Sequence, residues 1–456
     1  MDDLLTSYGE AIQALFARTT GSIKPGLERT EALLEKLGSP HRKLSTIHIA
    51  GTNGKGSVVA TCEALLRARG LVVGRYTSPH LVDFRERVTV NGKPMFEEEV
   101  LEFLERWIPT AEQMGATFFE VTTALAFDWL AKIEVDLAVI ETGLGGRLDS
   151  TNVLMPRVAT VTSIGLDHTD LLGDTLEAIA KEKAGIFKSG VPAVIGEPAP
   201  AIRELLAKCA KEAGARPVVV LDDSYAIGDV AVTANGTSFT LARRPLASGK
   251  SSADARTDAT SGGTSPWLWG GKEAQQVTTP LIGAHQARNT ATAIATLAAV
   301  GKEYLPPPGG ISKALAAVFL PGRFQRHGKF IFDVAHNPDG ARTIAQTLRA
   351  IDPPAPRTAL VAVLSDKDWQ GIIRELAPAV DRFLFTTAPS APAERKWDPA
   401  KALTFAKAQG FSAELEPDMD TALTLAQKDS GTVLVTGSFH TVGDAMSRLQ
   451  VSPFAA

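Results

Sequence analysis

Residues 44–57 read L-S-T-I-H-I-A-G-T-N-G-K-G-S, and a helical pattern follows them as far as Gly70. Leu44 to Ala50 has the β-branched and apolar content of a short buried strand. The glycine-rich run after it is typical of a tight loop, and beyond Ser57 the apolar residues recur at helical spacing. The stretch from Leu44 to Gly70 therefore predicts a strand, a loop and a helix, and the rest of the chain is organised around it.

This order of elements is what a phosphate-binding loop requires. Glycines let the backbone approach phosphates, and the helix N-terminus offers unpaired N–H groups and a partial positive charge. Lys55 would reach the terminal phosphates, and Ser57 would contact Mg²⁺ or a phosphate oxygen. We therefore predict that the loop binds phosphate groups through Gly51, Thr52, Asn53, Gly54, Lys55, Gly56 and Ser57.

The loop departs from the ordinary Walker A pattern because Gly56 follows Lys55, so that the hydroxyl residue arrives one position late. A glycine-rich turn without any ligand is the alternative interpretation. A bare turn needs neither Lys55 nor this many glycines, which favours the phosphate loop.

Composition limits the class of protein. With 456 residues the chain is long enough for two or three domains, and its 44% hydrophobic and 21% charged residues are typical of a soluble globular protein. The net charge of −4 argues against a nucleic-acid partner. No apolar run approaches the length of a membrane span, and the start M-D-D-L-L does not resemble a signal peptide, so a cytoplasmic location is predicted. Cys62 and Cys209 both lie in helical patterns and are interpreted as packed thiols.

The hydrophobic pattern predicts an α/β domain in the first part of the chain. Residues 1–43 have helical spacing, and strand-like runs then alternate with helical ones. The predicted strands are 44–50, 71–76, 135–140, 158–164 and 218–221, and the predicted helices include 97–107, 119–130, 179–188 and a long apolar one that ends near residue 300.

A change of composition and a turn divide the chain further. Residues 245–280 are dominated by Ser, Gly, Thr and Ala and are predicted to be a flexible surface insertion. Leu320-Pro321-Gly322-Arg323 is interpreted as a domain hinge. Beyond it, strand candidates at 330–334, 358–364, 382–387 and 433–436 predict a second α/β domain with a mostly parallel sheet. We expect one domain over residues 1–318 and another over 319–456.

Polar residues at predicted strand ends are candidate ligands. Ser78, in T-S-P-H, is either a ligand-binding group or part of the turn that starts a hairpin. Glu141 follows a buried strand and precedes a glycine-rich turn, which favours a Mg²⁺ ligand over a helix-start acid. His168 is either a metal or phosphate contact or an ordinary hydrogen-bonded side chain. Spacing alone does not distinguish Lys183 from the solvated lysines around it.

The second domain has a polar group of its own. Asp333, His336 and Asn337 follow its first strand and are expected at the carboxyl edge of the sheet. No glycine fingerprint follows that strand, so this domain is not predicted to bind a dinucleotide by itself.

Eight motifs, taken in order, resemble the folylpolyglutamate synthase/dihydrofolate synthase family of the Mur ligases. The resemblance covers nearly the whole chain except residues 245–280. It implies an α/β fold in which a phosphate-loop ATPase domain of the Mur ligase type precedes a smaller Rossmann-like domain. The motifs are G-T-N-G-K-G-S, T-S-P-H, E-T-G-L-G-G-R-L-D, D-H-T-D-L-L-G, K-E-K-A-G-I, H-Q-A-R-N, P-G-R and D-V-A-H-N-P.

The resemblance implies a role for each site residue. Ser78, Glu141 and His168 would bind Mg²⁺ at two sites, and Lys183 would be carbamylated and so become an anionic metal ligand. Lys55, His168 and Lys183 would take part in catalysis. The nucleotide would also be contacted across the domain cleft by Asn289, Arg323, Asp333 and His336. The pteridine-binding residues would be Gly26, Leu27, Thr117, Phe118, Phe119, Glu120, Leu148, Asp149 and Ser150.

The implied reaction is an ATP-dependent amide ligation. The γ-phosphoryl group of ATP would activate a substrate carboxylate as an acyl phosphate, which the amine of L-glutamate attacks. The acceptor would be dihydropteroate, tetrahydrofolate or both, and G-S-F-H-T-V-G-D at 437–444 resembles the bifunctional bacterial members. Small molecules are the expected partners, and family habit favours a monomer.

Two alternatives stay open. A Mur-type ligase acting on another carboxylate would carry a separate nucleotide-sugar domain, and the first 43 residues form only a short helical lead-in. A nucleotide-dependent switch has no need for a second metal site, so the joint presence of Ser78, Glu141, His168 and Lys183 argues against it.

Overall fold

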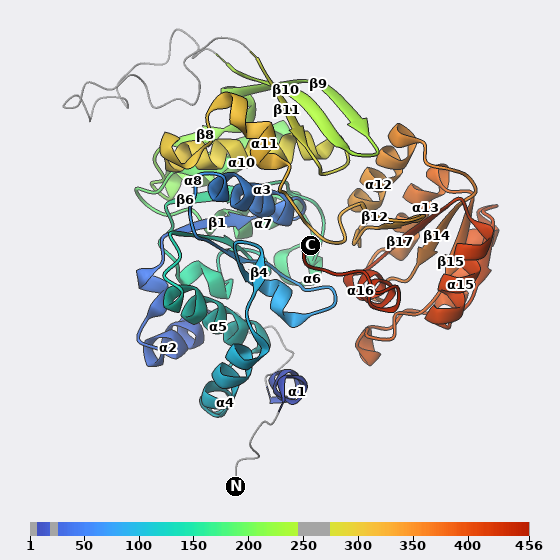
Figure 1. Cartoon of the computed structure of the whole chain (residues 1–456), viewed down its shortest axis with the longest axis horizontal. Helices are drawn as coiled ribbons and strands as arrows, with labels where there is room; N and C mark the ends of the chain where they lie inside the picture. Colours follow the sequence, from blue (N-terminus) through green and yellow to red (C-terminus); the bar gives the residue numbers. More distant parts are fainter. Residues whose placement is uncertain (1–6, 19–25, 245–273, 456) are drawn as a thin grey trace.

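The computed structural model describes residues 7–18, 26–244 and 274–455. Two α/β bodies lie side by side, the first coloured blue to yellow and the second orange to red, as Figure 1 shows. The first strands of the larger body and four strands of the smaller one, β13, β14, β15 and β17, follow the predicted alternation of strands and helices. The predicted fold class is confirmed.

The larger body is built on a sheet of eight strands among the described residues, in the order β4-β3-β2-β5-β1-β6-β7-β8. Neighbouring strands pair in parallel along the part of the sheet formed by β2, β5, β1, β6, β7 and β8. At one edge, β3 pairs antiparallel with β2 and forms an antiparallel hairpin with β4. The predicted phosphate-loop strand, β1, lies between β5 and β6. The bounds are β1 Thr46–Ala50, β2 Val73–Tyr76, β3 Val88–Val90, β4 Lys93–Pro94, β5 Leu137–Glu141, β6 Val158–Val161, β7 Ala193–Ile195 and β8 Val218–Val220.

Helices cover both faces of this sheet because its central strands are apolar on both sides. Ile47 and Ile49 of β1 pack with helices α3 and α10, whereas Ala138 and Ile140 of β5 pack with α5 on the other face. The bounds are α1 Tyr8–Arg18, α2 Glu28–Lys36, α3 Lys55–Arg67, α4 Glu97–Gln113, α5 Phe118–Lys132, α6 Thr169–Leu172, α7 Leu176–Ala184, α8 Pro200–Glu212, α9 Leu221–Ser224, α10 His285–Val300 and α11 Ile311–Leu315.

A small antiparallel sheet corrects part of the predicted insertion. Strands β9 (Tyr225–Thr233), β10 (Gly236–Arg243) and β11 (Gln275–Thr279) pair in the order β11-β10-β9. Residues 275–279 were assigned to the flexible insertion because their polar composition hides an alternation in which Val277 and Thr279 are buried. Residues 245–273, the remainder of that prediction, lie outside the described residues.

The smaller body contains the predicted mostly parallel sheet, with the order β12-β13-β17-β14-β15-β16. Only the edge strand β12 pairs antiparallel to its neighbour among these described strands. The sequence did not predict β12 or β16, because each has only three residues and neither is buried. The bounds are β12 Gln325–His327, β13 Phe330–Phe332, β14 Arg357–Val361, β15 Arg382–Phe385, β16 Ala413–Leu415, β17 Thr432–Thr436, α12 Pro338–Ile351, α13 Trp369–Leu376, α14 Pro399–Ala408, α15 Met419–Asp429 and α16 Phe439–Arg448.

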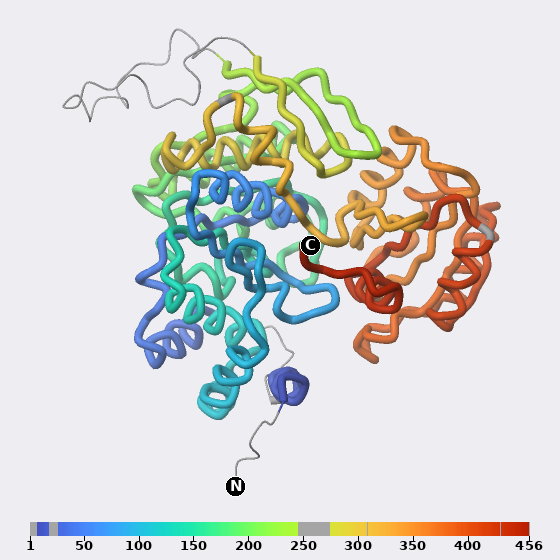
Figure 2. The backbone as a smooth tube through the Cα atoms, viewed as in Figure 1, coloured from blue at the N-terminus to red at the C-terminus, as the bar shows by residue number. Residues whose placement is uncertain are grey.

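The backbone trace shows the chain passing from the yellow part of the larger body into the orange part of the smaller one (Figure 2). Two predicted helices were wrong at their ends. Helix α7 stops at Ala184 and not at Lys188, because Gly185 follows as its C-cap, and α4 continues through Pro109 to Gln113 and does not end at Trp107. Cys62 and Cys209 are both free thiols. Within the described ranges, no helix has the length and apolarity needed to cross a membrane.

Candidate active site

The loop between β1 and α3 has the geometry of a phosphate-binding loop. Gly54 caps α3 with φ 86°, and a Cβ atom there would lie 2.5 Å from Oδ1 of Asn289. Only glycine fits this close approach without strain. The first hydrogen bond within the helix joins the Val58 N–H to the Gly54 carbonyl at 3.0 Å, so the preceding amides have no partner inside the helix. The predicted loop is confirmed as a strand-to-helix turn, and it brings Asn289 of α10 against it.

Lys55 lies folded over this loop and faces Glu141. Its Nζ donates to the carbonyl oxygens of Gly51 at 3.0 Å and Thr52 at 3.3 Å, and lies 3.7 Å from Oε1 of Glu141. The Ser78 N–H donates to the same carboxylate. Burial raises the pKa of Glu141, and the charges of Lys55 and Arg323 oppose that shift. Ser78 and Glu141, two of the predicted metal ligands, are therefore neighbours.

Lys183 is buried, although spacing in the sequence suggested a solvated lysine. Its side chain is 5% exposed, and its Nζ donates to the Gly51 carbonyl at 3.0 Å. Burial, together with the nearby charge of Lys55, lowers the pKa of Lys183 to about 7. A substantial fraction of this amine is therefore neutral near pH 7, which is the form that reacts as a nucleophile.

His168 begins the short helix α6 in a left-handed conformation, with φ 51°. Burial lowers the pKa of His168 to about 4, against the raising effect of Asp167, whose carboxylate lies 3.9 Å from Nε2. A neutral imidazole is the form that binds a metal ion. Among the described residues, no group of three or more His, Cys, Asp or Glu side chains is arranged to hold a metal ion. The predicted metal set depends instead on a serine and a modified lysine.

Arg323 and Asp333 come from the smaller body and reach toward the same centre. Burial lowers the pKa of Arg323, while Asp333 and Glu141 act in the opposite direction through their charges. The Asp333 carboxylate accepts the N–H groups of Phe324 at 2.9 Å and Ala335 at 3.0 Å. Asp333 thus fixes the turn that carries Arg323, whose guanidinium lies 5.2 Å from the Phe439 ring.

Asp167 joins the two bodies, and the sequence did not predict this contact. Its Oδ1 accepts from Nζ of Lys367 at 2.6 Å, and its Oδ2 lies 3.2 Å from Nε2 of His336. Nδ1 of His336 faces the Val334 carbonyl at 2.9 Å, so both ring nitrogens lie beside acceptor oxygens. The only sequence signal for Lys367 was its place in the loop after strand β14.

Two aromatic residues of the predicted pteridine region make packing contacts. Phe118 stacks on Phe16 with ring centroids 4.6 Å apart. Phe119 lies against Gly143, where a Cβ atom would overlap its ring. The region is therefore connected to the turn that follows Glu141.

The carboxylate of Glu120 has protein partners. Thr117 caps α5 and forms a capping box with Glu120, which also pairs with Arg29 at 2.9 Å. Gly26 and Leu27 precede α2, the helix that carries Arg29. Their roles toward a substrate, and those of Leu148, Asp149 and Ser150, remain predictions.

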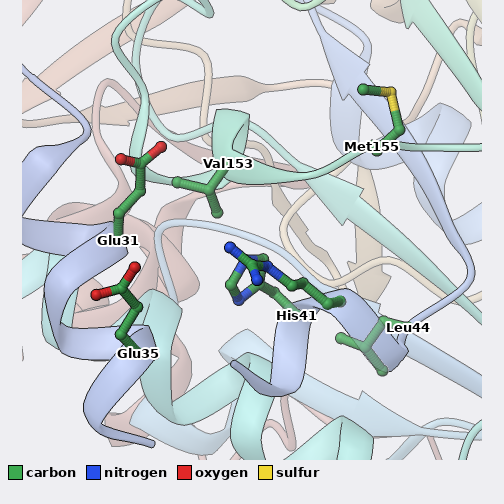
Figure 3. A pocket seen from close by; sticks show the side chains of 7 residues that line it. Glu31, Glu35, His41, Leu44, Val153 and Met155 are labelled. Atoms are coloured by element: carbon green, nitrogen blue, oxygen red, sulfur yellow. The ribbon is translucent and has the colours of Figure 1, made fainter. Parts of the chain in front are cut away.

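A pocket in the described surface lies away from these residues. Its volume is about 400 Å³, and Figure 3 shows Glu31 and Glu35 of α2 on one side of it and Met155 on the other. None of the predicted site residues lines it. The lining residues are Glu31, Glu35, His41, Arg42, Leu44, Val153 and Met155.

Together, the fold and this site identify the class of protein to which the chain belongs, the Mur ligases. The model of the Mur ligase middle domain matches residues 49–297, and that of the Mur ligase glutamate ligase domain matches residues 322–439. Within this class, the chain belongs to the dihydrofolate synthase/folylpolyglutamate synthase family of ATP-dependent glutamate ligases. The predicted resemblance is confirmed.

Three relatives illustrate the likeness. The dihydrofolate synthase/folylpolyglutamate synthase of Bacillus subtilis is 32% identical, with 98% of this chain and 100% of the relative covered. The structure of E. coli FolC in complex with DHPP and ADP has 31% identity and a TM-score of 0.80 over 99% of each chain. A bifunctional folylpolyglutamate synthase/dihydrofolate synthase with Mn, AMPPNP and L-glutamate bound has 32% identity and a TM-score of 0.77 over 98% of each chain.

Proposed function

We propose that this protein joins L-glutamate to dihydropteroate, to tetrahydrofolate or to both, with conversion of ATP to ADP and phosphate. The observation that carries the proposal is that Lys55 and Lys183 both donate to the Gly51 carbonyl, with Glu141 beside Lys55 and the charge of Arg323 reaching Glu141 from the smaller body. Relatives of known structure hold ADP, DHPP, AMPPNP and L-glutamate, which supports these substrates.

In this proposal the phosphate loop binds ATP and the acceptor carboxylate attacks the γ-phosphorus. The bond from that phosphorus to the bridging oxygen breaks, ADP leaves, and an acyl phosphate remains. The amine of L-glutamate then attacks the acyl carbon. Phosphate is the leaving group, and the product is the amide. Lys55 and Arg323 stabilise the negative charge on the transferred phosphoryl oxygens, which is mostly a matter of position and electrostatics.

We further propose two Mg²⁺ sites formed by Ser78, Glu141, His168 and a carbamylated Lys183. The depressed pKa of Lys183 supports this, because a neutral amine adds to CO₂ and releases a proton to give the anionic carbamate. The neutral state favoured for His168 suits a metal ligand. Mg²⁺, when bound, would neutralise charge on the ATP phosphates.

The domain boundary near residue 318 and the hinge at Pro321 belong to the proposal as well. Contacts from both bodies converge on one centre, and an acyl phosphate must be kept from water, so closure about this hinge would assemble the site and exclude solvent. We also propose a monomer in the cytoplasm, acting on small molecules and without a nucleic-acid partner.

The test is ADP formation by the purified protein with ATP, Mg²⁺ and L-glutamate. Dihydropteroate and tetrahydrofolate are compared as acceptors, with each reaction also run without glutamate. Turnover with both acceptors, dependent on glutamate, supports the bifunctional form, and turnover with one assigns that step. Turnover with neither favours a Mur-type ligase of another carboxylate, and ADP formation without acceptor or glutamate favours a nucleotide switch.

A further inference from the structure

His48 lies in the middle of β1, and its side chain has no exposed surface. Its Nε2 lies 2.8 Å from Oγ1 of Thr151, whereas its Nδ1 has no hydrogen-bond partner among the described residues. An imidazole with one unpaired nitrogen is costly in a buried strand where valine or isoleucine would pack without penalty. The hydrogen bond from His48 to Thr151 is therefore the feature that explains a histidine at this position.

The protons in this group can be arranged in only one satisfactory way. The Thr151 hydroxyl lies very close to Oδ1 of Asp149, a carboxylate that accepts only, so the hydroxyl must donate to it. The hydroxyl oxygen is then free to accept, and Nε2 of His48 must supply the N–H. Burial lowers the pKa of His48 to about 3, so the ring is neutral, and Nδ1 is left as an unprotonated acceptor.

Asp149 in turn fixes the glycine-rich turn after β5. Its Oδ1 also accepts the Thr151 N–H at 3.0 Å, and its Oδ2 accepts the Leu144 N–H at 2.8 Å. The Gly143 N–H donates to the same carboxylate. Asp149 therefore has a partner for each of the roughly four lone-pair directions of a carboxylate.

The turn held in this way borders the reaction centre on two sides. It begins directly after Glu141, and a Cβ atom on Gly146 would lie 2.8 Å from the Lys183 carbonyl. At Gly143 it touches Phe119 of the predicted acceptor region. The orientation of Asp149 therefore decides where the acceptor-binding segment lies relative to the metal ligands and the phosphate loop.

We propose that His48 is a positioning residue for the acceptor, because its Nε2–H group orients Thr151 and Asp149 and thereby holds the turn of residues 143–150. His48 touches neither ATP nor acceptor. This inference rests on the proposed function, since the acceptor is defined there. It predicts an effect on acceptor binding that is separate from ATP binding, although the phosphate loop begins only three residues after His48.

A matched pair of substitutions tests the donor itself. His48→Gln keeps an N–H group near the position of Nε2, whereas His48→Met has similar bulk and no donor. We expect His48→Met to raise the KM for the acceptor about 3- to 10-fold, because it loses one hydrogen bond, while its KM for ATP stays within about twofold of wild type. His48→Gln retains that hydrogen bond, so both of its KM values should stay within about twofold of wild type.

A double-mutant cycle tests the relay. Thr151→Val should raise the acceptor KM by a similar factor, Thr151→Ser should not, and the double variant His48→Met/Thr151→Val should be no worse than the poorer single variant. If the His48 variants fail to fold, the wild-type ring still decides the matter, because the inference requires a neutral ring protonated at Nε2, whereas the Thr151 pair alone reports on the hydrogen bond to Asp149. Nitrogen NMR of the wild-type histidine ring should show a neutral ring protonated at Nε2.

Several results would contradict the proposed role of His48. Equal losses in His48→Gln and His48→Met, a parallel rise in the KM for ATP, additive effects in the cycle, or a ring protonated at Nδ1 would each overturn the inference. Wild-type turnover that His48→Met fully matches overturns it while the proposed function stands. No wild-type turnover with either acceptor overturns the proposed function, and the acceptor role of His48 with it.

Discussion

Lys183 shows how a single residue acquires its chemistry from its surroundings. A lysine on an amphipathic helix is normally solvated and protonated, but this one is enclosed beside Lys55 and held by one carbonyl oxygen. Both effects disfavour the ammonium form. The same enclosure would place a carbamate next to Glu141 and the phosphate loop.

The substitution Lys183→Ala tests that role. We expect ligation to fall by at least about 100-fold, as when one electrostatic group is removed from a reaction centre, while ATP binding changes little because the phosphate loop is intact. A short carboxylic acid added to the assay should restore part of the activity by standing in for the carbamate. The measurements are ADP formation and ATP affinity.

Lys181→Ala is the control, because Lys181 lies on the same helix and is exposed. It should behave as the wild type does. Full ligation by Lys183→Ala would remove the carbamate from the mechanism.

The loop between β1 and α3 could be predicted from the sequence because its pattern is local. Gly51, Lys55 and Ser57 are recognisable because a strand, glycines and a helix N-terminus follow one another along the chain. Lys183 and Asp167 could not be found from spacing, since their environments depend on Gly51 and Lys367, which are distant in sequence. For Lys183 only the family resemblance provided the signal.

At the scale of elements, helices α2 and α5 are joined through one buried carboxylate. Glu120 is 2% exposed, accepts the Thr117 N–H at 2.7 Å, and pairs with Arg29 of α2. The sequence predicted both helices from their periodicity. It did not predict the pairing between them, because hydrophobic spacing gives the buried face of a helix and not its partner.

We therefore expect Glu120→Ala to destabilise the larger body by about 2–3 kcal/mol, since the change removes a helix cap and leaves Arg29 without this partner. Urea unfolding measures the change as a lower midpoint. Glu98→Ala, at an exposed first-turn position of α4, is the matched control and should shift the unfolding free energy by less than about 0.5 kcal/mol. Unchanged stability with a raised acceptor KM would instead make Glu120 a direct substrate contact.

At the scale of the whole molecule, the two bodies meet through apolar packing and through specific polar contacts. Leu81 of the larger body packs against the core of the smaller one, and its carbonyl approaches Gly443 of α16 so closely that a Cβ atom there would overlap it. Asp167 adds the ion pairs to Lys367 and His336. The sequence predicted two α/β bodies because each has its own strand pattern. A contact between the bodies produces no periodic pattern in the sequence, so it could not be predicted in the same way.

The contacts of Asp167 should set how readily the bodies separate. Asp167 and Lys367 are each only 10% exposed in their side chains, so water weakens this ion pair less than a surface pair. Removing the charge with Asp167→Asn should cost about 1–2 kcal/mol of contact free energy, and so shift the balance about 5- to 30-fold toward open forms. We expect small-angle scattering to give a larger radius of gyration for ligand-free Asp167→Asn than for wild type, with Lys367→Met giving the same change because it removes the other half of the pair. Asp170→Asn alters an exposed carboxylate in the same segment and should leave the scattering curve as it is.

Adding an ATP analogue with an acceptor should compact all four proteins if closure about Pro321 assembles the site. Identical curves for wild type and Asp167→Asn would mean that Leu81 and its neighbours hold the bodies together without the charge.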